Sequence, residues 1–185
     1  LPSGMIGAPT VMVEKIPNGA EGRVIRSALE ARLGKLVVAM MCLEMGGING
    51  VLPVAWAANA GLPIVDGDLM GRAFPEVQMC TPHLHGISAL PCAIADERLQ
   101  VITYETRDNA WLERLVRNTV STLGGCACAG LYPMTAIEAA GPTIRGTVTT
   151  AISVGEAIRT APEDPFDSLG SVVPLACLLT GKVTA

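Results

Sequence analysis

The chain has 185 residues, half of them hydrophobic and only 16% charged, so it can bury the core of one domain, or of one domain and part of another. The net charge of −4 and the lack of any basic run exclude an electrostatic surface for nucleic acid, so we expect no such partner. The apolar stretches stay well short of the roughly 20 residues that span a bilayer, so we expect no membrane partner and no secretory signal.

Alternating strand-like and helix-like segments predict an α/β fold, a three-layer α/β/α sandwich with a mostly parallel or mixed sheet. In the first third we expect a strand at 11–13, a helix at 21–32, a strand at 36–42, a helix at 50–60 and a strand at 63–65. The last three of these form a β-α-β unit whose crossover should be right-handed. Pro53 fits the first turn of its helix, and Gly61 fits its end.

Further along, strands at 87–94 and 99–104 should be joined by a polar turn at 96–98. The strongest helix is 109–123, which Asp108 or Asn109 can cap and whose apolar face should include Trp111, Leu112, Leu115 and Val116. A strand at 126–131 and a helix at 147–159 follow. We therefore predict an α/β domain over 1–160, a linker at 161–165, and a tail at 166–185 that does not obviously join the same sheet.

Six cysteines lie in apolar surroundings: Cys42, Cys80, Cys92, Cys126, Cys128 and Cys177. Disulfide frameworks belong to small secreted chains with thin cores, so we predict six reduced thiols in the core or in strands. The spacing of Cys126 and Cys128 is too tight for a zinc knuckle. A cytoplasmic location is the corresponding expectation.

Charge is concentrated in the loop after the strand at 63–65, which contains Asp66, Asp68, Arg72 and Glu76. Ligands of open α/β sheets bind outside the carboxyl ends of strands, so these four residues are candidate catalytic groups. In extended backbone Asp66 and Asp68 share one face and could hold a divalent metal or serve as acid and base. The alternative is structural, with Asp68 capping a turn and Asp66 pairing with Arg72. Arg72 could also orient a carboxylate or a planar amide.

A second loop, after the strand at 36–42, offers Glu44, Gly46, Gly47 and Asn49 as candidate substrate-binding residues. Its glycines permit close backbone approach at a helix start, where N–H groups can bind an anion or oxyanion. A plain strand-to-helix turn is the alternative. The loop has neither a dinucleotide fingerprint nor a P-loop, so nucleotide binding is poorly supported.

The only histidines are His83 and His85, which would share a face in a strand and could then be metal ligands beside Asp66 and Asp68. A structural or surface role is the alternative for both. Cys80, close by, is a nucleophile only where its thiolate is stabilised, and nothing in the sequence indicates that.

Several of these segments occur in order and carry a family resemblance: residues 7–10 with Glu14 and Lys15, then 44–49, then 66–79, and finally 124–125. Together they closely resemble the S-methyl-thiohydantoin desulfurase-like family, also designated DUF917, over about residues 4–160. The resemblance implies a three-layer α/β domain followed by a smaller β-rich domain, which the tail at 166–185 would enter. Relative to that family, the chain is expected to lack a Gly-rich N-terminal segment and most of the β-rich domain.

The resemblance implies a hydrolase-like protein acting on a cyclic amide of hydantoin or thiohydantoin type. A divalent metal is an open possibility for its cofactor. The alternative function is a non-catalytic partner subunit of a hydantoinase/oxoprolinase-type protein, because family members are often encoded beside or fused to such proteins. A shortened sheet would expose an edge strand and apolar surface, which favours a homo-oligomer.

Overall fold

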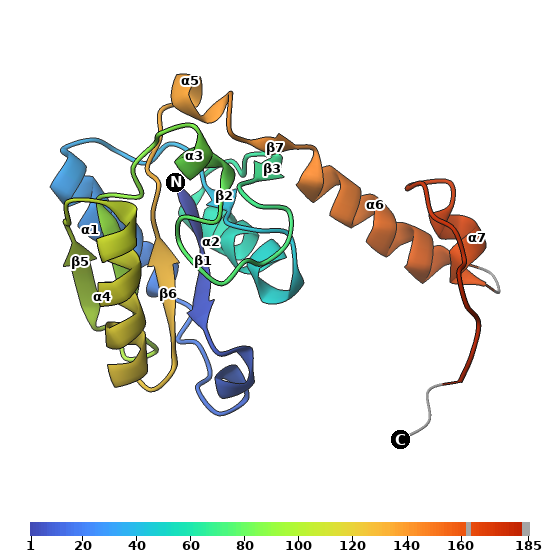
Figure 1. The fold of residues 1–185 in the computed structure, drawn as a ribbon, viewed down its shortest axis with the longest axis horizontal. Coiled ribbons are helices and arrows are strands. Elements are labelled where there is room, and N and C mark those ends of the chain that lie inside the picture. The colour runs from blue at the N-terminus through green and yellow to red at the C-terminus, as the bar shows by residue number, and fades with distance from the viewer. Residues whose placement is uncertain (162–163, 183–185) are drawn as a thin grey trace. The chain divides into compact units, whose positions relative to one another are not determined.

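The computed structural model describes residues 1–161 and 164–182, and the chain divides into two compact units, residues 1–147 and 148–185 (Figure 1). The first unit contains, in chain order, β1 (Pro2–Gly7), η1 (Pro9–Val13), α1 (Glu21–Leu33), β2 (Met41–Cys42), η2 (Gly47–Gly50), α2 (Leu52–Ala60), β3 (Gly67–Asp68), α3 (Thr81–Leu84), β4 (Cys92–Ala95), β5 (Val101–Tyr104), α4 (Asn109–Thr122), β6 (Cys126–Gly130), α5 (Ala136–Ala139) and β7 (Ile144–Arg145). The second unit contains nearly all of α6 (Thr147–Thr160), and α7 (Pro165–Leu169).

The main sheet has five strands in the order β2-β1-β6-β4-β5. Only β1 and β2 are parallel, whereas β1–β6, β6–β4 and β4–β5 are antiparallel. The sheet is therefore mixed, and the predicted α/β fold is confirmed. A separate two-stranded ribbon pairs β3 with β7.

Helices cover both faces of this sheet, because its strands alternate their side chains between two cores. On one face α1 and α2 pack, through Ile25, Leu29 and Trp56, against Ala93, Ala95 and Cys128. On the other face α4 packs, through Leu112, Val116 and Val120, against Ile94, Ala127 and Ala129. Neighbouring residues of β4 and β6 thus serve opposite layers, as the two-residue period of a strand requires.

The central strand β1 is the element that the sequence does not reveal. Three of its six residues are Gly or Pro, which are depleted in strands, and the predicted strand at 11–13 is wrong because that segment is the 3₁₀ helix η1. Tertiary contacts explain the small residues. A Cβ on Gly4 would lie 2.9 Å from Oδ1 of Asn49, and one on Gly7 would lie 2.3 Å from the carbonyl oxygen of Gly125.

The predicted strands at 36–42 and 63–65 are mostly wrong in extent. Regular pairing is limited to β2 at Met41–Cys42, and the segment around Ile64 contributes a single parallel bridge to Met40. The chain between them contains α2, with Pro53 in its first turn and Gly61 in the left-handed conformation at its end, as predicted.

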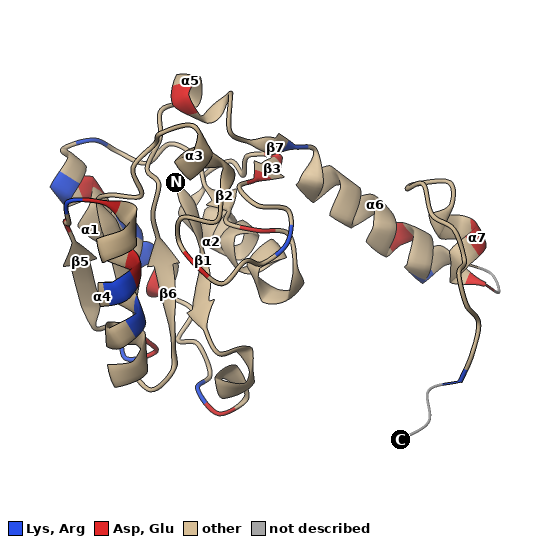
Figure 2. Ribbon diagram, in the orientation of Figure 1, with Lys and Arg blue, Asp and Glu red and all other residues tan. Residues whose placement is uncertain are grey.

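The elements predicted from residue 87 onward agree better with the structure. Strands β4 and β5 form the expected hairpin, β6 begins at Cys126, and the Asp108 side chain caps α4 by accepting the N–H of Trp111 at 2.8 Å. The predicted apolar face of α4 is partly wrong, because Trp111 and Leu115 are 38% and 41% exposed. Basic and acidic residues follow one another along this helix (Figure 2), and the guanidinium groups of Arg107 and Arg114 lie over the Trp111 ring.

The structure does not test the domain boundaries predicted near the end of the chain. The linker at 161–165 includes residues 162–163, which lie outside the described residues, and Pro165 already begins α7. The described residues after α7, up to 182, include no helix or strand, so the entry into a β-rich domain stays a prediction. In the described part of the chain, no helix is long and apolar enough to cross a membrane.

All six cysteines are free, which agrees with the predicted reduced thiols. Five of them are buried, whereas Cys177 is exposed, so its predicted place in the core or in a strand is wrong.

Candidate functional site

Two loops of the first unit, residues 43–50 after β2 and residues 69–80 after β3, are joined along their backbones. The N–H of Leu69 donates to the carbonyl of Leu43 at 3.1 Å, and the N–H of Met45 donates to the carbonyl of Gly71 at 3.1 Å. The Glu44 loop and the acidic loop therefore lie side by side, as their positions at the ends of neighbouring segments predicted.

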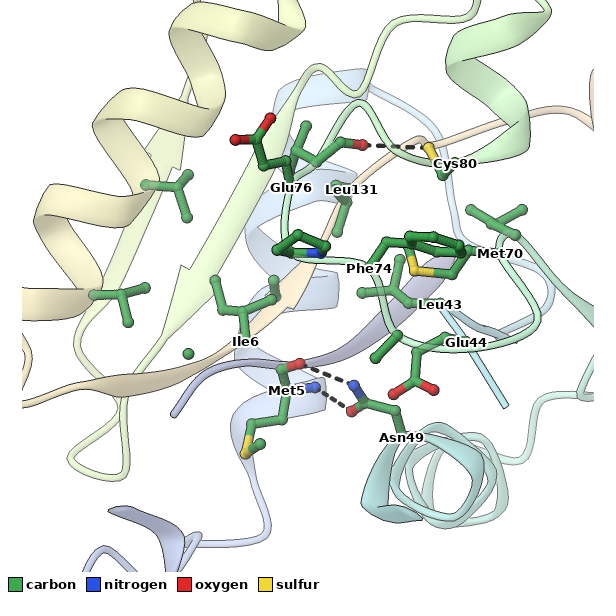
Figure 3. Close-up of a pocket in the computed structure, with 18 of the residues that line it drawn as sticks. Met5, Ile6, Leu43, Glu44, Asn49, Met70, Phe74, Glu76, Cys80 and Leu131 are labelled. Carbon is green, nitrogen blue, oxygen red and sulfur yellow. Dashed lines mark hydrogen bonds between the residues drawn. The ribbon is translucent and has the colours of Figure 1, made fainter. Parts of the chain in front are cut away.

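These loops, together with β1, β6 and α4, line an open cavity of about 860 Å³. Its wall is largely apolar and includes Met5, Ile6, Leu43, Leu69, Met70, Phe74, Val77, Val116 and Leu131 (Figure 3). Six of the predicted site residues line it: Glu44, Gly46, Gly47, Asn49, Arg72 and Glu76. Four others, Asp66, Asp68, His83 and His85, are not among the lining residues.

Glu44 is the most unusual group of the wall. It is only 6% exposed, and its Oε2 has no hydrogen-bond partner. Burial raises the pKa of its carboxyl, the nearby Asn49 amide opposes this effect, and the charge of Asp68 adds to it. Gly46 makes room for the carboxyl, since a Cβ there would lie 2.7 Å from Oε2. A buried carboxyl with a free oxygen and a raised pKa is the kind of group that enzymes use as an acid.

Asn49 has a structural task. Its Oδ1 accepts the N–H of Met5 at 2.6 Å, and its Nδ2 donates to the carbonyl of Met5 at 3.0 Å (Figure 3). The carboxamide thus continues the pairing of β1 beyond β2 and ties the Glu44 loop to the sheet. Substrate contact by Asn49 stays a prediction.

The two aspartates of the acidic loop have different surroundings. Asp68 is fully buried, and its Oδ1 accepts the N–H groups of Met70, at 2.8 Å, and of Gly71. This is the turn-capping role that was the alternative interpretation of Asp68. The carbonyl of Asp66 accepts the N–H of Gly146 at 3.0 Å, which ties β3 to the end of β7. Neither residue faces the cavity, so their catalytic role stays a prediction.

The outer part of the acidic loop, residues 72–78, is fastened to α4. Glu113 accepts the N–H of Val77 at 2.9 Å, and Arg117 donates to the carbonyl of Pro75 at 2.9 Å. Within the loop the Arg72 guanidinium lies 5.8 Å from the centre of the Phe74 ring. Glu76 accepts a hydrogen bond from the Gln78 amide. This loop forms one side of the cavity.

A polar network that the sequence did not indicate runs behind the loop. Tyr132 donates to the carbonyl of Val77 at 3.0 Å, Cys80 donates to the same carbonyl at 3.3 Å, and the Asn109 amide lies 3.0 Å from the Tyr132 hydroxyl. Burial raises the pKa of the Cys80 thiol and of the Tyr132 hydroxyl, so both are neutral. A neutral thiol is a weak nucleophile, which agrees with the sequence interpretation of Cys80.

The histidines do not form the expected pair. Residues 81–84 are the helix α3, not a strand, so side chains two positions apart point in different directions and the predicted shared face is wrong. Nδ1 of His83 lies 3.1 Å from the Asn109 amide, and both histidines are exposed. The described residues include no group of three or more His, Cys, Asp or Glu side chains placed to hold a metal ion. The metal assignment stays a prediction.

Two family models match the chain along its whole length. The S-Me-THD-like N-terminal domain matches residues 1–106, and the S-Me-THD-like C-terminal domain matches residues 107–185. The chain belongs to the S-Me-THD-like family. This confirms the resemblance found in the sequence. The border between the two matches falls between β5 and α4, within the first compact unit.

Among solved structures, a crystal structure of a protein from Chromobacterium violaceum is similar to this S-Me-THD-like chain, with a TM-score of 0.80 and 24% sequence identity. The similarity covers 92% of this chain and 50% of that one, so this chain spans about half the length of the solved relative. At this identity the likeness establishes the fold alone. No curated protein matches the chain.

Proposed function

We propose that the cavity binds a small cyclic amide of hydantoin or thiohydantoin type, and that Glu44 is the acid–base group of its hydrolysis. One observation carries this proposal: the free Oε2 of a buried glutamate lies in the wall of a largely apolar cavity of about 860 Å³. Cavities of this size and polarity suit small organic ligands, with a few polar groups fixing their orientation. The substrate class comes from the family.

The surroundings of Glu44 suit an acid. Because burial raises its pKa, the carboxyl keeps its proton closer to neutral pH than an exposed glutamate does. A neutral carboxyl can donate a hydrogen bond to the carbonyl, thiocarbonyl or ring nitrogen of a planar amide. The apolar wall would accept the flat face of such a ring and exclude most water.

The proposed reaction is an addition of water. The water oxygen bonds to a ring carbon, and the bond from that carbon to its leaving nitrogen or sulfur breaks. The leaving atom takes the proton of Glu44, and the resulting carboxylate recovers a proton from the attacking water. Negative charge on the former carbonyl oxygen would face the amides of Gly46 and Gly47, which donate in none of the backbone hydrogen bonds of the described residues.

The other predicted residues of the wall have supporting roles in this proposal. Arg72 is exposed and would meet the polar edge of the ring at the cavity mouth. Glu76 would help to set the position of the loop through its bond with Gln78.

The test is turnover of hydantoins and thiohydantoins by the purified protein and its variants. We expect Glu44→Gln to lower kcat by about 10²–10⁴-fold, the usual contribution of a general acid or base. The matched control is Glu105→Gln, which makes the same change at an exposed glutamate paired with Arg32 and should leave turnover unchanged. Full activity in Glu44→Gln would contradict the proposal.

The alternative is that the chain is a non-catalytic partner subunit of a hydantoinase/oxoprolinase-type protein. Its support is a set of exposed apolar side chains on the first unit that a partner could cover: Val13, Ile16, Leu36 and Val38. Absence of turnover with any such ring, together with stable co-purification with a protein of that type, would favour the subunit.

A further inference from the structure

A second, smaller cavity lies in the other layer of the first unit. It has a volume of about 210 Å³ and is formed by the start of α1, the middle and end of α2, and the residue before β2. Its lining residues include Arg23, Arg26, Trp56 and Asn59. Trp56 and Met40 belong to the core on the α1 and α2 face of the sheet, whereas the large cavity adjoins the core on the α4 face.

Trp56 supplies the first observation that points to a ligand. The residue is 4% exposed, yet its indole Nε1 has no hydrogen-bond partner. An indole N–H can only donate, so a group that satisfies it must be an acceptor. The ring is held against the first turn of α1 by Gly22, where a Cβ would lie 2.3 Å from the ring atoms Cγ and Cδ2.

Arg26 supplies the second observation. Its Nε is buried and has no hydrogen-bond partner, although the guanidinium forms a long ion pair of 3.9 Å with the Glu30 carboxylate. One turn earlier, Arg23 is exposed and takes part in none of the ion pairs of the described residues. Both arginines and Trp56 therefore line the same small space, and neither Nε of Arg26 nor Nε1 of Trp56 has a hydrogen-bond partner.

The backbone adds to this positive potential, since Gly19, Ala20 and Gly22 place the cavity at the N-terminus of the 13-residue helix α1. The positive end of the helix dipole favours an anion there. The one carboxylate of this turn, Glu21, is already engaged by the N–H groups of Asn18 and Gly19 and does not line the cavity.

We propose that this cavity is a binding site for a phosphate-type oxyanion. Such a group has acceptor oxygens in several directions, which matches donors contributed by a helix start, two guanidinium groups and an indole. Arg26 and Arg23 would supply the charge, and Trp56 would supply a neutral donor from the wall of the cavity. The site lies outside the cavity that contains Glu44 and does not depend on the proposed hydrolysis.

Tryptophan fluorescence provides a direct test, because the chain has only two tryptophans. In a Trp111→Phe background Trp56 is the single reporter, and inorganic phosphate is added at an ionic strength held constant with chloride. We expect a saturable change in Trp56 emission. Arg26→Gln should raise the phosphate Kd by about tenfold or more, the usual effect of losing one charged hydrogen bond.

The matched control is Arg32→Gln, which removes the same charge from the far end of the same helix, where Arg32 pairs with Glu105. It should leave the phosphate Kd unchanged. Equal effects of Arg26→Gln and Arg32→Gln would overturn the proposal, as would the lack of any saturable response. Acetate binding as tightly as phosphate would overturn the assignment to phosphate.

A second readout does not depend on fluorescence. A ligand of the folded state raises Tm, so phosphate should stabilise the unmodified protein against heat. Trp56→Phe keeps an aromatic ring, a smaller one, and loses the N–H, so most of that rise in Tm, measured against the variant's own Tm without phosphate, should disappear. An unchanged rise in Trp56→Phe would contradict the role of the indole.

Discussion

The substitution Gly46→Ala tests the placement of Glu44 without changing any charge. The backbone of Gly46 is extended, with φ of −161°, so alanine can adopt it without strain. Its Cβ would, however, lie 2.7 Å from Oε2 of Glu44, where ordinary van der Waals contact begins near 3.4 Å. The carboxyl must therefore move by about 0.7 Å.

This displacement sets the expected magnitude. A misplacement of about 1 Å at a reacting group can lower a rate by about 100-fold, so we expect kcat to fall about tenfold to a hundredfold. Stability should change little. Replacing glycine by alanine at a compatible position stabilises by about 0.4–1 kcal/mol through the unfolded chain, which offsets part of the cost of moving the side chain.

The assay is a double-mutant cycle on ring hydrolysis with Gly46→Ala, Glu44→Gln and the double variant. If Gly46 acts through Glu44, the alanine should cost nothing further once the glutamate has been replaced. Gly155→Ala is the control, because no atom lies within 4 Å of its added Cβ and only stability should respond. Additive losses in the cycle, or full activity of Gly46→Ala, would refute the reasoning.

Three further predictions concern stability. Burial raises the pKa of Glu44, so the protonated carboxyl contributes stability that is complete below the unfolded pKa and is lost as the pH rises through the folded pKa. Relative to the unmodified protein, Glu44→Gln should therefore gain stability between about pH 4 and about pH 8, as measured by urea midpoints. Asp68→Ala removes the acceptor for the N–H groups of Met70 and Gly71 and should lower the free energy of unfolding, measured in urea, by about 2–4 kcal/mol. An unchanged urea midpoint would contradict the turn-capping role. Gly22→Ala brings a Cβ to 2.3 Å from the Trp56 ring, so it should lower the free energy of unfolding by about 1–3 kcal/mol and shift the tryptophan emission. An unchanged emission spectrum would show that the ring does not pack against Gly22.

Elements with strong local signals could be predicted from the sequence. The helix α4 has an apolar stripe and a capping aspartate, and the β4–β5 hairpin has two apolar runs around a polar turn. Strand β1 has none of these signals, because its small residues serve contacts with Asn49 and Gly125, which are distant in sequence. Pairing on both sides, with β2 and β6, outweighs its weak intrinsic preference.

The candidate site, too, was predictable only where the signal is local in sequence. The order of charged and glycine-rich loops after successive strand-like segments was enough to predict that Glu44 and the acidic loop lie together. It was not enough to predict which carboxylates of the two loops face the cavity, since the side-chain direction of Asp68 depends on a turn that only the folded loop forms.

By itself, the sequence determined the family, the α/β class, the two loops of the site and the reduced cysteines, because these depend on local pattern and composition. Only the tertiary structure decided that Glu44 lines the cavity, that burial raises the pKa of Cys80 and Tyr132, and that Arg26 and Trp56, thirty residues apart, line one small cavity. The physical reason is burial: whether a polar group keeps its charge or lacks a partner depends on the neighbours that exclude water from it, and here those neighbours come from distant parts of the chain.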